Sequence, residues 1–294
     1  MYPAAFEYVA VHTLDEALAT LSEGDEDTKV LAGGQSLIPM MKLRLATPTK
    51  LVDINRVPGL SGLDASDGHL VVGALTRHND VVNSDLVKAE NHTMAAAAPW
   101  IADPLVRNLG TVGGSLAHAD PQGDWGSVML ACGAEVVAIS SSRGERTIPV
   151  TELFVDLFTS ALEPDELLTE VRVPRYTGPA GGTYLKLERK VGDYATVGVA
   201  VHLQLDGDRI GQAGIALTGV GSKNIKATQA EGALIGQTPG DELFAHAGEL
   251  AAAAADPRTD VRGTAEFKRS VVSTFVRRGL SEAVSQAAGQ VVPA

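Results

Sequence analysis

The stretch "NLGTVGGSLAHADPQGDW" (108–125) places a glycine-rich turn, hydroxyl side chains, a histidine and two carboxylates within eighteen residues. Glycine adopts backbone conformations that other residues avoid and lets a ligand approach the main chain closely. Thr111 and Ser115 add hydroxyl donors, whereas Asp120 and Asp124 add acceptors. Donors suit phosphate groups, and a carboxylate suits ribose hydroxyls or a ring N–H group. The pattern is compatible with a nucleotide site, but taken alone it is also compatible with an ordinary surface turn.

A second stretch, "VLAGGQSLIPMMKLR" (30–44), has two glycines at the end of an expected strand, followed by Ser36 at the start of an expected helix. Free backbone N–H groups at a helix start attract anions. The stretch lacks the G-x-G-x-x-G pattern of nicotinamide dinucleotide sites and the G-K-S/T of a P-loop, so both are disfavoured. Alone, it is more typical of a tight turn with Ser36 as the N-cap. Two such turns about eighty residues apart predict a ligand with two phosphates held from both sides.

A third stretch, "YLKLERKVGDYATVG" (184–198), forms a basic cluster of Lys186, Arg189 and Lys190 in an acidic protein. Alternation along a strand predicts that Lys186, Glu188 and Lys190 share one face. Tyr194 follows a Gly-Asp pair, where it can present its ring to a planar cofactor. Alone, this stretch is more typical of a solvated edge strand with a tyrosine in the turn.

Composition excludes several classes of protein. The net charge of −12 disfavours nucleic acid, whose binding depends on basic side chains. No run of apolar residues reaches the length of a bilayer span, and the first residues lack the pattern of a secretory signal, so we expect a cytoplasmic protein. Cys132 is the single cysteine and lies in an apolar run, which predicts a buried structural thiol and excludes a disulfide framework, a cysteine-ligated zinc site and an iron–sulfur cluster within this chain.

Metal and hydrolase sites are also disfavoured. His118 has no second histidine at metal-ligand spacing, and the aspartates that follow it lack the ligand density of a calcium loop. No G-x-S-x-G motif is present for a serine hydrolase.

Periodicity predicts an α+β protein of two domains, with its boundary in the Gly/Pro-rich stretch 175–182. The first sixty residues read as a β-α-β start, in which Thr13 and Glu16 have the spacing of a capping box. Further strands are expected near Leu70 and at 134–140, 145–150 and 167–174, with helices at 77–101 and 124–133. After the boundary we expect a three-stranded sheet with a hairpin around 206–208 and alternation on both arms, then helices near 225–235, 241–255 and 264–280.

Taken together, three segments resemble the signature segments of one family, the FAD-binding subunits of molybdenum hydroxylases, which include the carbon monoxide dehydrogenase medium subunit and the flavin domain of xanthine dehydrogenase. They are "AGGQSLIPMMKLRLATPTKLVDINRV" (32–57), "NLGTVGGSLAHADPQGDW" (108–125) and "LKLERKVGDYATVGVAV" (185–201). A fourth segment, "DVRGTAEFKRSVVSTFVRRGL" (260–280), resembles the C-terminal helix of the family.

The resemblance implies a fold. Residues 1–176 are similar to an FAD-binding domain of the vanillyl-alcohol-oxidase type, built from two α/β subdomains at about 1–57 and 58–176. Residues 177–294 are similar to the family's C-terminal α+β domain, a small antiparallel sheet with helices. FAD would then lie extended between the subdomains.

The resemblance also assigns cofactor contacts and no catalytic residue or metal ligand. It places the pyrophosphate on the backbone of the first turn and further FAD contacts on the second turn, at the cleft and near the flavin ring. The first-turn residues are Ala32, Gly33, Gly34, Gln35 and Ser36, and the second-turn residues are Thr111, Gly114, Ser115, His118 and Asp124. Leu168 and Lys186 are the residues at the cleft, and Tyr194 is the residue near the flavin ring. Gln35 replaces a histidine of many relatives, which a backbone contact should tolerate. We expect Gly33→Val or Gly114→Val to yield protein without FAD, because the side chain would occupy phosphate space.

As implied by the resemblance, the chain is one subunit of a three-part oxidoreductase. Its partners would be a small 2Fe-2S subunit and a large molybdopterin-binding subunit, as a dimer of heterotrimers, with the FAD passing electrons to an external acceptor. The substrate of the complex stays open among carbon monoxide, purines, aldehydes and N-heterocycles. Two alternatives are a stand-alone FAD-dependent oxidase or reductase of the same fold, and a nucleotide-binding or scaffold subunit that has lost FAD.

Overall fold

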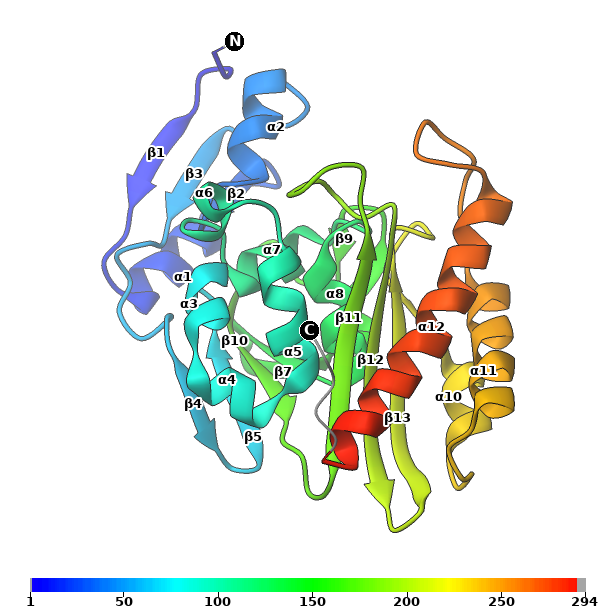
Figure 1. The fold of residues 1–294 in the computed structure, drawn as a ribbon. Helices are drawn as coiled ribbons and strands as arrows, with labels where there is room; N and C mark the ends of the chain where they lie inside the picture. Colours follow the sequence, from blue (N-terminus) through cyan, green and yellow to red (C-terminus); the bar gives the residue numbers. More distant parts are fainter. Residues whose placement is uncertain (1, 290–294) are drawn as a thin grey trace.

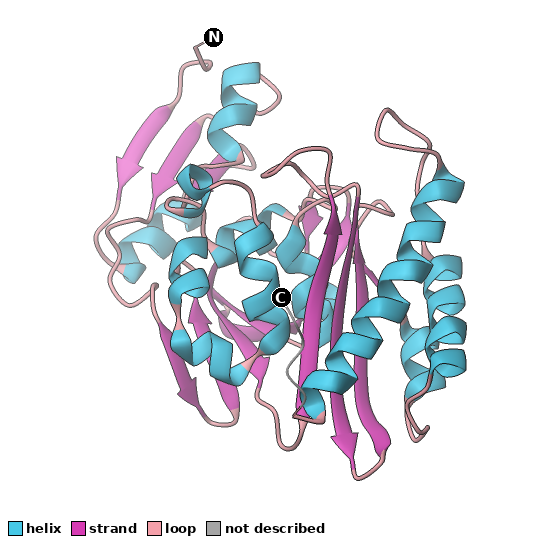
Figure 2. Cartoon of the chain, in the orientation of Figure 1, coloured by secondary structure: helices cyan, strands magenta, loops and turns pink. Residues whose placement is uncertain are grey.

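The computed structural model describes residues 2–289, which form three sheets and one small hairpin with helices packed between and outside them (Figure 1, Figure 2). The first sheet is parallel, in the order β1-β3-β2, and two helices connect its strands. Its elements are β1 (Glu7–Ala10), α1 (Leu14–Ser22), β2 (Thr28–Leu31), α2 (Leu37–Leu43) and β3 (Lys50–Asp53). The predicted β-α-β start is confirmed.

The predicted cap of α1 is confirmed, although the capping box is only half formed. The Glu16 N–H donates to Thr13 Oγ1 at 3.1 Å, so Thr13 is the N-cap. The Glu16 carboxylate accepts from the N–H of His12 at 2.7 Å rather than from that of Thr13. The Glu16 side chain therefore binds the residue before the N-cap, whereas a capping box would have it bind the N-cap residue itself.

The second sheet is antiparallel, in the order β4-β5-β10-β6-β7. The strand expected near Leu70 is one arm of a hairpin, and the three later strands are confirmed. The elements of this part are β4 (Leu63–Ser66), β5 (His69–Gly73), α3 (His78–Asn83), α4 (Asp85–Glu90), α5 (His92–Ala97), η1 (Ala98–Trp100), α6 (Pro104–Arg107), α7 (Val112–His118), α8 (Asp124–Cys132), β6 (Glu135–Ser140), β7 (Gly144–Pro149), α9 (Val150–Leu153), the small hairpin β8 (Phe154–Asp156) and β9 (Thr159–Ser160), and β10 (Glu166–Pro174).

The largely helical stretch expected over 77–101 is divided into short helices. Ser84 and Asn91 have extended backbones, and their side chains accept from the N–H groups of Val87 and Met94 at 3.2 and 2.9 Å. Serine and asparagine compete with the helical backbone in this way, so each one ends a helix and caps the next.

The third sheet is antiparallel, in the order β11-β12-β13-β14, and three helices follow it. Its elements are β11 (Ala180–Leu187), β12 (Val197–Asp206), β13 (Arg209–Thr218), β14 (Ile225–Lys226), α10 (Thr228–Leu234), α11 (Asp241–Ala254) and α12 (Ala265–Ala287). The expected three-stranded sheet was wrong by one strand, because β14 is too short to leave a pattern. The hairpin and the three helices are confirmed.

The expected alternation on both arms of this hairpin was wrong. Every β12 residue from Val197 to Gln204 is buried, because α12 covers one face of the sheet while α5 and α8 cover the other (Figure 1). Glycines let two of these helices approach the strands closely. A Cβ on Gly214 would lie 1.8 Å from the carbonyl oxygen of Ala131 in α8, and one on Gly181 would lie 2.0 Å from that of Ala283 in α12.

The apolar core is continuous between the second and third sheets, which are connected by residues 175–179. Tyr184, Ala200 and Ala216 of the third sheet belong to the same buried cluster as Trp125 and Met129 of α8. Helix α8 is thus fixed against the third sheet, and its first turn is held at the junction of the two sheets.

None of the helices within residues 2–289 has the length and apolarity needed to cross a membrane.

Candidate cofactor site

The two glycine turns meet in space. A Cβ on Gly33 would lie 2.3 Å from the carbonyl oxygen of Leu109 and 2.7 Å from the Cα of Gly110. A Cβ on Gly114 would lie 3.6 Å from the Cβ of Ala32. The structure therefore brings together two segments that the sequence separates by about eighty residues.

Two side chains that the sequence analysis missed tie these turns together. Asn55 Nδ2 donates to the carbonyl of Ala32 at 2.8 Å. Arg77 donates through one nitrogen to Asn55 Oδ1 at 2.7 Å and through the other to the carbonyl of Leu109 at 2.5 Å. Asn55 lies just beyond the carboxyl end of a parallel strand, where ligands commonly bind, and that position was a usable signal.

The first turn offers unpaired backbone donors. Within residues 2–289, the N–H groups of 33–37 have no acceptor in the protein. Gly34 has a φ of +71°, in the left-handed region that favours glycine. Ser36 is at the N-cap position of α2, as expected, but its side chain makes no capping hydrogen bond. A run of free N–H groups is a fitting cradle for a phosphate.

The second turn does not offer the free backbone donors that a phosphate held from both sides would need. The N–H groups of 112–115 all donate within the protein, to Thr76, Ala74 and Thr111, at 3.0–3.1 Å. Phosphate donors are therefore concentrated in the first turn. The expected loss of FAD in Gly114→Val therefore needs a different reason. The added side chain would first meet Thr111 Oγ1, 2.6 Å from its Cβ, and not a phosphate.

A third segment reaches the two turns through Tyr194. Tyr194 is 46% exposed, and its partial burial raises its pKa; the nearby Asp120 carboxylate adds to this shift and Ser36 opposes it. The tyrosine therefore lies beside both turns. His118 is next to Phe158, with 5.2 Å between ring centroids, and burial lowers the pKa of His118 while Asp120 opposes the shift.

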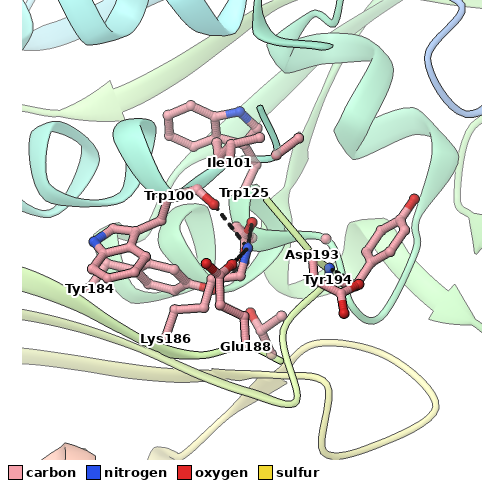
Figure 3. A network of polar contacts seen from close by, with 12 residues as sticks. Trp100, Ile101, Trp125, Tyr184, Lys186, Glu188, Asp193 and Tyr194 are labelled. Atoms are coloured by element: carbon pink, nitrogen blue, oxygen red, sulfur yellow. Dashed lines mark hydrogen bonds and ion pairs between the residues drawn. The ribbon is translucent and has the colours of Figure 1, made fainter. Parts of the chain in front are cut away.

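Lys186 is buried in an ion pair rather than exposed in a basic cluster. Its Nζ donates to Asp124 Oδ2 and to the carbonyl of Trp100, each at 2.9 Å, and lies 3.6 Å from Glu188 Oε2 (Figure 3). Strand β11 ends at Leu187, so the expected shared face of Lys186 and Lys190 was wrong. Arg189 and Lys190 are exposed in the loop that follows.

Asp124 links this lysine to the start of α8. The Tyr184 hydroxyl donates to Asp124 Oδ1 at 2.5 Å, and both side chains are buried. Burial raises the pKa of Asp124, while the Lys186 ammonium and the hydrogen bonds oppose the shift. Both oxygens of this carboxylate thus have protein partners, which fixes the N-terminus of α8 on β11.

Two other predicted positions lie in the core. Leu168 pairs with Ala138 in the second sheet, and its side chain is buried in the central cluster. Cys132 is buried, and burial raises its pKa to about 11, so the predicted structural thiol is confirmed.

Comparison with known proteins identifies the family. The model of the FAD binding domain in molybdopterin dehydrogenase matches residues 4–176, and that of the CO dehydrogenase flavoprotein C-terminal domain matches residues 182–283. The chain belongs to the FAD-binding subunits of the molybdenum hydroxylases. FAD is accordingly its cofactor, and the chain is the flavoprotein subunit of an oxidoreductase complex, as the sequence predicted.

The similarity of this FAD subunit to its relatives extends over nearly the whole chain. It is 41% identical to subunit alpha of the 6-hydroxypseudooxynicotine dehydrogenase complex of Paenarthrobacter nicotinovorans, over 98% of this chain and 97% of the relative. It is 39% identical to the carbon monoxide dehydrogenase medium chain of Hydrogenophaga pseudoflava, over 98% and 100%. The solved carbon monoxide dehydrogenase of that organism, in a form lacking the Mo-pyranopterin moiety, superposes with a TM-score of 0.94 at 40% identity, over 97% of this chain and 99% of the other.

Proposed function

We propose that FAD lies extended across the junction of the two glycine turns, with its pyrophosphate on the free N–H groups of 33–37. The observation that carries this placement is the run of unpaired donors next to the contact between Gly33 and Leu109. Backbone donors held in place before binding need no reorganisation when an anion arrives. Ala32, Gln35 and Ser36 complete this first turn.

The second turn contributes the opposite wall of the site. Its own N–H groups are used within the protein, so Thr111 and Gly114 act by shape, while the half-buried side chains of Ser115 and His118 supply polar groups. We place the flavin ring beside Tyr194, which lies next to both turns.

Three of the expected contact residues act from beneath this surface. Asp124 and Lys186 are already paired with each other, and Leu168 is buried in the core. We propose that Asp124 and Lys186 hold α8 and β11 at the spacing that the cofactor requires, that Leu168 supports them from the core, and that any direct contact to FAD is made from these fixed positions.

The same proposal divides the chain into an FAD-binding domain of the vanillyl-alcohol-oxidase type at 1–176, with subdomains at about 1–57 and 58–176, and a C-terminal domain at 177–294. The separate parallel and antiparallel sheets support the two subdomains. The continuous core between α8 and the third sheet indicates that the C-terminal domain is fixed to the rest.

When bound, FAD supplies the redox chemistry, since it accepts and releases electrons one or two at a time. The residues of this chain bind it, orient it and shield it. We propose that the electrons come from a small 2Fe-2S subunit, that a large molybdopterin subunit oxidises the substrate, and that the complex is a dimer of heterotrimers. The relatives named as medium chains and complex subunits support this assembly.

Reconstitution from separately expressed subunits tests the proposal. The chain purified with its two partner subunits should contain one FAD per copy, and substrate should bleach the flavin absorbance only when both partners are present. Bleaching of the flavin by an organic substrate in the chain alone would instead indicate the stand-alone oxidase or reductase. A chain that carries no FAD in any preparation would overturn the proposed function.

A further inference from the structure

Arg262 connects the C-terminal helices to the loop that carries Tyr194. It lies in the loop between α11 and α12, and its Nη1 donates to the carbonyl of Tyr194 at 2.8 Å. Its Nη2 donates to Asp193 Oδ1 at 3.1 Å, and the same oxygen accepts the N–H of Tyr194 at 2.8 Å. The side chains of Arg262 and Asp193 are each only 17% exposed. One guanidinium group thus holds the tyrosine backbone directly and through its neighbour.

The loop that carries Arg262 is itself firmly held on α12. Lys268 is buried, and its Nζ donates to the carbonyl of Arg258 at 2.9 Å and to Asp260 Oδ2 at 2.7 Å. The other oxygen of Asp260 accepts the N–H of Arg262 at 2.9 Å. Because α12 packs on β11 and β12, the guanidinium group is positioned by the body of the protein.

The loop at 188–196 has few other supports. Its neck is closed by the N–H of Thr196, which donates to the carbonyl of Leu187 at 2.8 Å. Its turn has Gly192 at a φ of +82°, close to Ala102 on the opposite side. The tyrosine side chain extends away from Lys186 and is not part of the buried network (Figure 3). Arg262 is therefore the main polar contact between the residues around Tyr194 and the C-terminal helices.

We propose that Arg262 is a positioning residue for FAD, acting by holding Tyr194 across the cofactor site; this role rests on the proposed function above. Arginine suits the role because its planar fork reaches two acceptors at once, which a lysine ammonium on a single stem does poorly. Loss of the fork would free the tyrosine, loosen its contact with the flavin and admit solvent to the ring.

The test compares the assembled complex carrying Arg262→Gln or Arg262→Lys with wild type and with a matched control. Arg258→Gln is that control, because Arg258 lies exposed on the same loop and its side chain has no hydrogen bond within the described part of the chain. Tyr194→Ala gives the scale of the flavin signal when the ring is absent. Hydrogen exchange of 188–196 reports the loop, and flavin fluorescence with the FAD dissociation constant reports the cofactor.

Arg262→Gln should raise exchange in 188–196 at least roughly tenfold, since losing the charge-assisted hydrogen bond to the Tyr194 carbonyl alone corresponds to about that factor. Its flavin fluorescence should move toward that of Tyr194→Ala, with Arg262→Lys in between and Arg258→Gln unchanged. Unchanged exchange in both Arg262 variants would overturn the proposal, and so would faster exchange with wild-type flavin fluorescence and affinity. A wild-type complex without FAD would overturn the proposed function and the role of Arg262 with it, whereas a wild-type complex that binds FAD confines any failure to Arg262.

Discussion

Gly33→Ala adds one methyl group at the contact between the two glycine turns. The new Cβ would lie 2.3 Å from the carbonyl oxygen of Leu109, whereas ordinary contacts begin near 3.4 Å, so the backbones must separate by about 1 Å. Arg77 holds the same carbonyl and resists that separation. Overpacking of this kind costs about 1–3 kcal/mol. The separated turns must be brought back together for FAD to bind between them, so the dissociation constant should rise about 5- to 150-fold.

Release of FAD from the purified complex, followed by the fluorescence of free flavin, measures this dissociation constant. Urea denaturation of the same preparation separates a loss of affinity from a loss of fold. Gly232→Ala is the control, because a Cβ at this position in α10 has no neighbour within 4 Å and should stabilise the helix slightly. The reasoning fails if Gly33→Ala keeps both its FAD affinity and its urea midpoint within error of wild type.

Three further predictions concern ionisable side chains. Lys186→Met leaves the Asp124 carboxylate buried without its cation and should lower the free energy of unfolding by about 3–5 kcal/mol in urea, and adding Asp124→Leu should restore most of it; a loss below about 1 kcal/mol would show that the pair is solvated. Arg77→Met removes both bonds that join the turns and should speed FAD release roughly tenfold, measured by stopped-flow fluorescence; release at the wild-type rate would contradict the role given to Arg77. Burial lowers the pKa of His78 and His202 to about 4, so the unfolded chain binds more protons between pH 6.5 and 4, and each histidine should cost about 2 kcal/mol of stability as the pH falls from 7 to 5. His202→Phe should remove its share of that loss, and a urea midpoint independent of pH in the wild-type protein would refute the assignment.

The elements of the fold that could be predicted are those determined by a few neighbouring residues. Two glycines at the end of a strand, a capping threonine and a hairpin turn each act over a few residues, so the pattern of the chain reveals them. Strand β14 has only two residues and is held by its pairing with Ala216 and Leu217, which no local pattern encodes. The breaks at Ser84 and Asn91 were accessible in principle, because both residue types favour caps.

The site was predictable in its segments and not in its internal bonds. Glycine turns can be recognised from sequence because their backbone requirements are local. The ion pair of Lys186 and Asp124 joins residues 62 positions apart, and the bond from Arg77 to Leu109 spans 32. Charged residues of this kind look like surface residues until the fold buries them, so the sequence alone placed Lys186 in a local basic cluster, with a solvated edge strand as the alternative. Its burial and its partner follow only from the packing of β11 on α8.

The order in which the ribosome delivers these segments has a consequence for how the flavoprotein matures. The first turn and the second turn leave the ribosome early, but Tyr194 follows about eighty residues after Gly114, and Arg262 follows 148 residues after it. At 5–20 residues per second, roughly 7–30 s pass between the second turn and the arginine that holds the tyrosine. During that interval the free N–H groups of 33–37 are present without the loop that carries Tyr194 fixed beside them. Flavin captured then would lack the contact with Tyr194, so we expect stable loading only at the end of synthesis, after α12 has packed on the third sheet.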